Sequence, residues 1–193
     1  MNIQKITENE FKVSNWAGGK TSQVAIFPMD RNYTDRDFDF RISSATVDGG
    51  KSNFTNLPNY NRFLTVLSGE IMLENVTTNQ KLRLFPYEVY AFDGGDDIIS
   101  EGKCKDFNLM IRKNTCCGDM TVLNLSNNSE KISVKSYENL LIFCATGEVT
   151  ITDLENQLSL KPFEAAILKG RNEIIVSSLK DAVIILCHMH QND

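Results

Sequence analysis

Short runs of alternating or β-branched apolar residues, each ended by Gly, Asn or Asp, recur from residue 23 to residue 188. A period of two is typical of strands with one buried face, and few stretches show helical spacing. The pattern predicts an all-β protein with two successive sets of strands. The first set is 23–27, 38–47, 62–67, 70–75, 80–84, 89–92 and 107–112, and the second is 131–134, 139–145, 148–152, 157–160, 165–168, 173–177 and 182–188.

The second set repeats the turn residues of the first. Each contains a Gly-Glu pair, a later Pro and a Gly eight residues after this Pro: Gly69, Glu70, Pro86 and Gly94, then Gly147, Glu148, Pro162 and Gly170. The step from the first Gly to the Pro differs by only two residues, and such shared spacing indicates a duplicated unit. We expect tandem repeats over residues 1–113 and 114–193, packed as one compact unit, with residues 113–130 as their mainly polar connection.

Composition and charge exclude several classes of partner. The 193-residue chain can bury a core without disulfides. Its net charge of -5 and pI near 5.1 argue against nucleic acid and anionic membranes, which both need a basic face. No apolar run resembles a membrane span or signal peptide, and the five cysteines lack a disulfide pattern. We expect a cytoplasmic protein with a small-molecule partner, and a homodimer stays open.

Sequence motifs in the first repeat share the order and spacing of one known family. They are NWAGGKT at 15–21, FDFRISSA at 38–45, NRFLTVLSG at 61–69, FDGGD at 92–96 and DFNLMIR at 106–112. Over residues 10–113 they resemble the HutD (histidine-utilisation) family, although only Ala17 stands where the family usually has Lys-Asn. The resemblance implies an RmlC-like cupin jelly roll in two repeats, the second shorter and degenerate, and a link to histidine degradation.

The positions that carry metal ligands in metal-dependent cupins hold other residues here. Their pattern places two histidines and a glutamate before the Gly-Glu turn and a third histidine after the Pro. The glutamate position falls on Arg62, the histidine pair falls within 55–58, and the late histidine falls on Ala91. The second repeat has Leu140 and Ile167 at corresponding positions. Because a guanidinium repels a divalent cation, we expect neither a metal nor another cofactor.

Strand alternation separates polar from apolar side chains in the first repeat. Arg41 and Ser43 share one face of their strand, and Asp106 and Asn108 share one face of another. These faces either meet water, the commoner arrangement in antiparallel sheets, or line the jelly-roll interior together with Arg62. Because all of these residues fall in family motifs, the second interpretation is favoured.

The expected ligand of such an interior is a small carboxylate. Arg41 and Arg62 could hold it through charge-assisted hydrogen bonds, while Asp106 and Asn108 could recognise an amine, amide or imidazole nitrogen. Alternatively, Asp106 neutralises a buried arginine. The predicted ligand-binding residues are Trp16, Gly18, Gly19, Thr21, Arg41, Ser43, Arg62, Asp106 and Asn108.

The sequence Gly19-Lys20-Thr21 imitates the end of a phosphate-binding loop. Ser14 stands where that motif needs its first Gly, and no strand-loop-helix pattern surrounds it, so nucleotide binding is not expected. We expect the glycines to allow close backbone approach at the mouth of the jelly roll. Trp16 is either an apolar wall of the pocket or a core residue.

Different functions remain open at this point. The first is a non-enzymatic binder that regulates or senses histidine degradation, with a ligand such as urocanate or formylglutamate. The second is a metal-free isomerase or lyase with Asp106 as general base, and the third is an interaction module without a ligand. His188 and His190 share one side of the last predicted strand, but without a third ligand nearby we expect only a frayed strand end.

Overall fold

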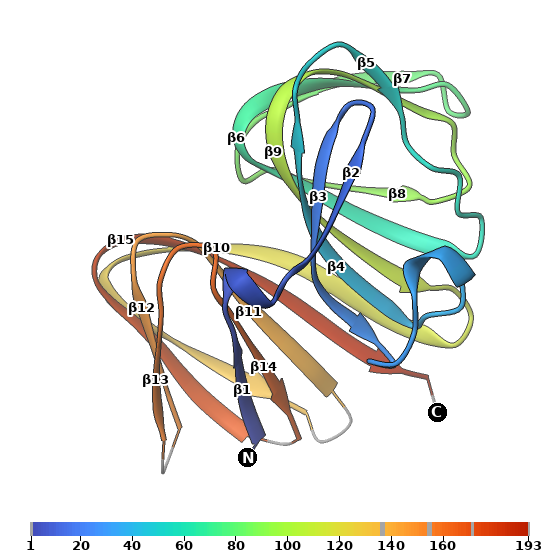
Figure 1. Ribbon diagram of the computed structural model, residues 1–193. Helices are drawn as coiled ribbons and strands as arrows, with labels where there is room; N and C mark the ends of the chain where they lie inside the picture. Colours follow the sequence, from blue (N-terminus) through green and yellow to red (C-terminus); the bar gives the residue numbers. More distant parts are fainter. Residues whose placement is uncertain (1, 136–137, 154–155, 171, 193) are drawn as a thin grey trace. The chain divides into compact units, whose positions relative to one another are not determined.

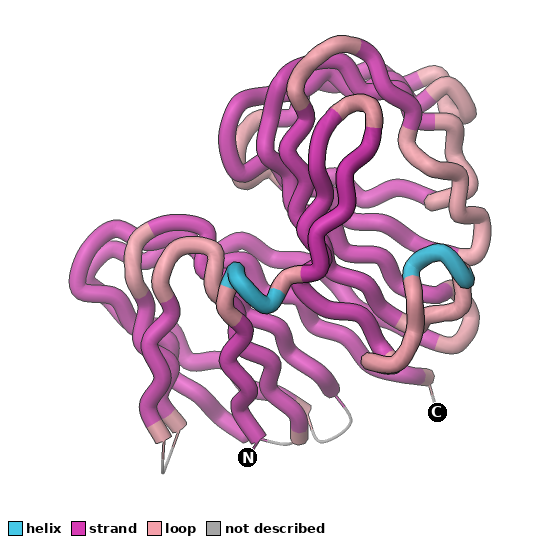
Figure 2. The backbone as a smooth tube through the Cα atoms, viewed as in Figure 1, coloured by secondary structure: helices cyan, strands magenta, loops and turns pink. Residues whose placement is uncertain are grey.

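The computed structural model describes residues 2–135, 138–153, 156–170 and 172–192, and it consists almost entirely of strands (Figures 1 and 2). The predicted all-β class is therefore confirmed. Among these residues, no helix has the length and apolar character needed to cross a membrane. The described chain forms two compact units, Phe11–Cys117 and Met1–Glu10 with Gly118–Asp193.

The unit Phe11–Cys117 is built on one sheet with the order β2-β3-β4-β9-β6-β7, and β5 and β8 pair with β9 and β6. All of the pairings among these strands are antiparallel. A short helix, η2 (Tyr33–Asp35), follows β3. The strands are β2 (Lys12–Trp16), β3 (Gly19–Phe27), β4 (Phe40–Val47), β5 (Lys51–Asn53), β6 (Tyr60–Asn75), β7 (Gln80–Leu84), β8 (Val89–Asp93) and β9 (Ile98–Arg112).

The other unit is built on a sheet with the order β1-β14-β11-β15-β12-β13, in which β10 pairs with β15. A short helix, η1 (Glu8–Glu10), follows β1. The strands are β1 (Asn2–Ile6), β10 (Cys116–Val134), β11 (Glu138–Thr146), β12 (Val149–Thr152), β13 (Gln157–Leu160), β14 (Ala165–Lys169) and β15 (Asn172–Gln191). Strand β1 pairs with β14 from Asn2↔Lys169 to Ile6↔Ala165. The start of the chain thus belongs to this unit, whereas the expected repeats were residues 1–113 and 114–193.

The turns after the two prolines of the repeat have the same backbone geometry. Tyr87 and Phe163, the residues after the prolines, have φ angles of 68° and 66°. Their amides donate to the carbonyl oxygens of Val66 and Cys144, at 2.9 and 2.8 Å. The glutamates that follow, Glu88 and Glu164, each accept a hydrogen bond from the backbone N–H three residues earlier. The duplication read from the turn residues therefore corresponds to a repeated local structure.

The glycine of each Gly-Glu pair permits a close approach between strands. Gly69 and Gly147 have φ angles of 78° and 75°, and the ladder to the neighbouring strand shifts register within the three residues before each. A Cβ at Gly69 would collide with the carbonyl oxygen of Lys103, and one at Gly147 with that of Asp181. Only glycine suits both the left-handed backbone and the contact.

Several strands were missed because their residues alternate weakly. Strands β1, β2 and β5 were not predicted, and β10 covers most of the expected connection at 113–130. All five residues of β2 are exposed, and most residues of β10 are polar or exposed. Such edge segments become strands through backbone pairing with a neighbour rather than through burial of one face.

Two glycine substitutions can distinguish the cost of the collision at Gly69 from the cost of its left-handed backbone. Gly50 also has a positive φ of 83°, but no atom lies within 4 Å of the place a Cβ would occupy. We expect Gly50→Ala to lower the free energy of unfolding by about 1 kcal/mol and Gly69→Ala by about 3 kcal/mol or more. Urea denaturation of both variants measures the difference; equal losses would contradict the collision.

Candidate functional site

The unit Phe11–Cys117 contains a cavity of about 290 Å³. This volume is near the lower end of small-molecule pockets. Strands β2, β3, β4, β5, β6 and β9 contribute to its wall, together with Tyr33 of η2 and the segment after β5. Arg41, Ser43, Arg62, Asp106 and Asn108 all line it, and each is between 4% and 7% exposed. The interpretation in which these polar faces meet bulk water is therefore wrong.

Three neighbouring strands, β4, β9 and β6, place the polar side chains in successive rungs. In one rung, Met110 of β9 pairs with Arg41 on one side and Arg62 on the other. Since neighbouring strands lie about 4.8 Å apart, the two arginine backbones are separated by roughly 10 Å. The next two rungs on the cavity side pair Ser43 with Asn108 and Ala45 with Asp106.

Arg41 is held firmly by neighbours on β3 and β4. Its Nε donates to Oε1 of Gln23 at 2.9 Å, and its Nη1 donates to Oγ of Ser43 at 3.1 Å. The guanidinium also lies over the ring of Tyr33, 4.1 Å from the centroid. Burial lowers the pKa of Arg41 from its ordinary value, although the group stays cationic at physiological pH. These contacts position the cation but supply no counter-charge.

Arg62 has fewer polar contacts than Arg41. Its Nη1 donates to the carbonyl oxygen of Thr55 at 3.3 Å, and the guanidinium lies over the rings of Phe54 and Phe92, 4.8 and 5.1 Å from the centroids. Among the described residues its buried Nε finds no hydrogen-bond acceptor. Burial lowers the pKa of Arg62 to about 10, an effect opposed by Tyr33 and Asp106.

Neither arginine forms an ion pair with a carboxylate of the described residues. A buried cation without an anion is costly, and attraction to an incoming anion offsets this cost. Asp106 lies in the same cavity, yet it does not pair with either arginine in the described contacts. No direct contact therefore supports the alternative in which Asp106 serves only to neutralise an arginine.

Asp106 and Asn108 present oxygen acceptors to the cavity. Oδ1 of Asp106 accepts a hydrogen bond from the backbone N–H of Ala45 at 3.1 Å. Burial raises the pKa of Asp106 to about 7, against the opposing effects of that N–H and of Arg62. Oδ1 of Asn108 is buried and receives no hydrogen bond from the described residues. Both groups can accept a hydrogen bond from a ligand N–H or O–H.

The N-terminal motif contributes to the mouth of the cavity through its larger side chains. Trp16 and Thr21 line the cavity, and Trp16 is 39% exposed, so it is a wall residue rather than a core residue. Gly18 and Gly19 are not among the lining residues. Side chains there would collide with the indole of Trp16 and with the carbonyl oxygen of Thr46. The close approaches of this glycine pair are therefore to the protein itself.

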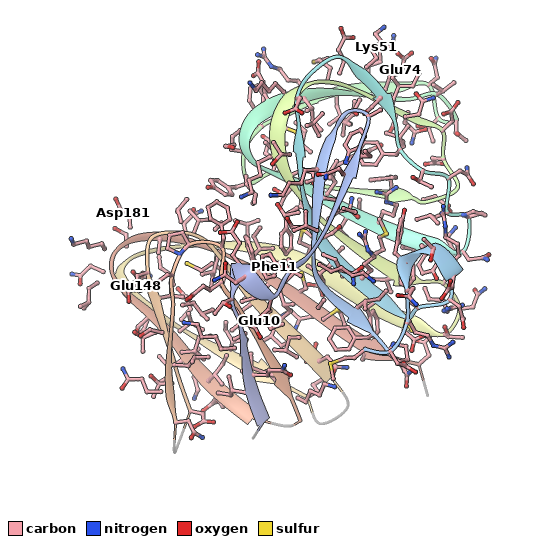
Figure 3. All side chains as sticks on the ribbon, in the orientation of Figure 1. Glu10, Phe11, Lys51, Glu74, Glu148 and Asp181 are labelled. Atoms are coloured by element: carbon pink, nitrogen blue, oxygen red, sulfur yellow. The ribbon has the colours of Figure 1, made fainter. Side chains whose placement is uncertain are left out.

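One wall of the cavity was not anticipated from the sequence. The consecutive residues Ser52, Asn53, Phe54 and Thr55 all line it, directly after Lys51, which Figure 3 labels at the start of β5. The hydroxyl of Ser52 lies 3.0 Å from that of Ser100 across the β5–β9 pair. Ser52 and Asn53 end the short strand β5, and Phe54 and Thr55 follow it. A stretch so short has no periodicity that marks its inward side. Tyr33 and Met110 were missed as well.

The other unit has apolar residues where the cavity has its polar ones. Counted back from the repeat glycine, Leu140 corresponds to Arg62. Through the matching strand pairs, Ile184 corresponds to Asp106 and Leu186 to Asn108. All three belong to one buried hydrophobic cluster. The polar site is thus a property of the unit Phe11–Cys117.

The donor set of the cavity does not suit a divalent metal. Among its described lining residues, one carboxylate accompanies two guanidiniums, and there is no imidazole or thiolate.

His188 lies on β15, where its Nδ1 is 2.8 Å from Oε1 of Glu138. The expectation of a frayed strand end there is wrong, because β15 stays paired with β11 as far as His190.

Comparisons with known proteins agree on the fold. The HutD family model matches residues 8–186, whereas no curated protein matches the sequence significantly. The conserved protein of unknown function PA5104 from Pseudomonas aeruginosa PAO1 aligns with a TM-score of 0.86 at 19% identity, covering 98% of this chain and 100% of that one. HutD from Pseudomonas fluorescens SBW25 gives 0.79 at 19% identity, with 100% of both chains covered.

A more distant neighbour is the bacterial pirin YhhW from Escherichia coli, whose structure is a complex with nickel(II). It aligns with a TM-score of 0.70 at 12% identity and covers 97% of this chain and 98% of that one. Such neighbours share the cupin fold, so the predicted fold class is confirmed. At these identities the likeness concerns the fold alone.

The raised pKa of Asp106 has a consequence for stability. Its carboxyl binds a proton more tightly in the folded than in the unfolded state, so this stabilisation is complete below about pH 4 and is lost as pH rises to about 7. We expect wild type to lose up to about 4 kcal/mol relative to Asp106→Asn over this range. Urea denaturation from pH 4 to pH 8 tests it, with the exposed Asp97→Asn as control; parallel profiles for all three proteins would contradict it.

Proposed function

The chain belongs to the HutD family, and from this premise we propose that its cavity binds a small carboxylate metabolite without a metal and that the protein regulates or supports histidine catabolism. The supporting observation is the pair of buried guanidiniums that lack a carboxylate partner among the described residues. Fold alone supports no ligand, since one fold serves many functions.

In this proposal Arg62 is the principal anchor of the carboxylate. Nε and Nη1 of Arg41 already donate to Gln23 and Ser43, whereas the buried Nε of Arg62 has no acceptor among the described residues. A guanidinium binds a carboxylate best through two parallel N–H donors on one edge. Arg41, across Met110 in the same rung, then adds a second positive charge.

The remainder of the ligand would meet acceptors and aromatic side chains. Asn108 and Asp106 can each accept from a nitrogen donor, and Trp16 and Phe54 offer apolar contact. A carboxylate with an N–H group a few bonds away satisfies both requirements. Urocanate and N-formylglutamate have this chemistry and serve as test ligands.

The carboxyl of Asp106 supports a second candidate function. Burial raises its pKa to about 7, close to the value that suits a general base at neutral pH. In a metal-free isomerase or lyase, Arg41 or Arg62 would stabilise the negative charge that develops on the substrate. Asp106→Asn would then abolish turnover and leave binding of the substrate nearly intact, whereas a pure binder shows no turnover in either form.

The third possibility, an interaction module without a ligand, gives the cavity no role. Burying Arg41, Arg62 and Asp106 costs stability, and a surface that serves only as an interface has no need of them. We propose a cytosolic location, where the five cysteines of the chain would stay reduced. We further propose that both units are cupin repeats and that neither nucleic acid nor a membrane is a partner; the homodimer stays a prediction.

Calorimetric titration with urocanate and N-formylglutamate tests the proposed function. We expect at least one acid to bind and Arg62→Ala to weaken it by at least about 30-fold, because the carboxylate loses a buried charged partner. Arg83→Ala is the matched control, since Arg83 is an exposed arginine of the same unit that pairs with Glu70. No heat with either acid, or equal binding by Arg62→Ala, would refute the proposal.

A further inference from the structure

The charged groups of the cavity do not balance. Arg41 and Arg62 bring two positive charges, and Asp106 brings one negative charge when it is ionised. No other side chain among the described lining residues is an acid, a lysine or an arginine. The cavity therefore carries one net positive charge with Asp106 ionised and two with Asp106 protonated.

The backbone of Asp106 lies at a different level of the sheet from the arginine rung. Met110, between the two arginines, is four residues from Asp106 along β9, or roughly 13 Å of strand. One carboxylate oxygen of Asp106 accepts from Ala45, and no other hydrogen bond to this carboxylate is described. A ligand anchored at the arginines would thus bring its far end toward Asp106.

We infer that Asp106 determines which ligand charge the cavity accepts: a monocarboxylate binds while Asp106 is ionised, and a dicarboxylate binds only while Asp106 is protonated, with the proton taken from solvent where Asp106 was ionised. The proton forms an O–H bond on Asp106, and this hydroxyl donates to the second carboxylate of the ligand. No other bond is made or broken. The inference rests on the proposed function and specifies the class of ligand that it admits.

The surroundings of Asp106 leave protonation as the means of accommodating a second anion. The charged or titratable lining groups on neighbouring elements are Arg41 of β4, Arg62 of β6 and Tyr33 of η2, and Cys104 shares the strand of Asp106. Strand β3 contributes the uncharged Thr21, and β5 contributes Ser52 and Asn53. Burial raises the pKa of Cys104 to about 12, so it stays neutral.

Two carboxylates brought together in a buried site share a proton, because both cannot stay ionised at low cost. Burial by itself already raises the pKa of Asp106 to about 7. A second carboxylate nearby raises it further, so binding of a dicarboxylate draws a proton from solvent above pH 7. Below that pH the proton is already present, and affinity no longer depends on it.

The matched ligands for the test are N-formylglutamate, a dicarboxylate, and N-formylglutamine, in which a neutral amide replaces the second carboxylate. Titration calorimetry from pH 5.5 to pH 8.5 measures their affinities. We expect the dissociation constant of N-formylglutamate to be flat below about pH 6.5 and to rise about tenfold per pH unit above pH 7. For N-formylglutamine we expect less than about threefold per unit.

Proton uptake is measured directly by repeating the titrations at pH 8 in buffers of different ionisation enthalpy. N-formylglutamate should take up about one proton per molecule bound, and this readout needs no variant. In Asp106→Asn, whose amide oxygen can still accept from Ala45, both the uptake and the pH dependence should disappear. The exposed Asp97→Asn, with the same change of net charge, should behave as wild type.

The outcomes separate this inference from the proposed function. If neither urocanate nor N-formylglutamate binds, both are refuted, and if urocanate binds but N-formylglutamate does not bind at any of these pH values, only the role of Asp106 is refuted. If N-formylglutamate binds but shows no proton uptake, or if Asp106→Asn keeps the pH profile of wild type, the role of Asp106 is refuted while the carboxylate site stands. The role of Asp106 would also be refuted if the affinity for N-formylglutamine depended on pH as steeply as that for N-formylglutamate, because ligand charge would then not matter.

Discussion

The burial of two guanidiniums without a described counter-anion is the constraint on which the site depends. Arg41 and Arg62 are each about 95% buried, and the surrounding structure holds them through aromatic rings and neutral acceptors instead of carboxylates. Such contacts keep the cations in place while leaving their charge available. The arrangement costs folding free energy and is understandable where an anion completes it.

The strand register makes this arrangement possible. Strands β6 and β9 pair along most of their length, from Tyr60↔Arg112 to Asn75↔Ile98, and β4 pairs with β9 on the other side. A slip of one residue in either ladder would turn an arginine to the opposite face of the sheet. At position 69 only glycine avoids a collision with the carbonyl oxygen of Lys103 on β9.

The two units share local backbone features but differ in the side chains at corresponding strand positions. Both units share the Pro turn and the glycine before the Glu. Where one has Arg62, Asp106 and Asn108, the other has apolar residues that join a packed cluster. The turn after the Pro and the glycine before the Glu are thus common to both units. The chemistry of the cavity depends on a few side chains that the backbone does not specify.

The sequence alone was sufficient for the all-β class and the sides of the strands, because a period of two is local and turn residues mark strand ends. It also indicated that Arg62 stands where a metal-dependent cupin has a carboxylate. Only the tertiary structure joined β1 to β14, formed the wall at residues 52–55 and placed Met110 between two arginines. Pairing between distant strands, irregular segments and the burial that shifts the pKa of Asp106 depend on contacts remote in sequence, which no local pattern encodes.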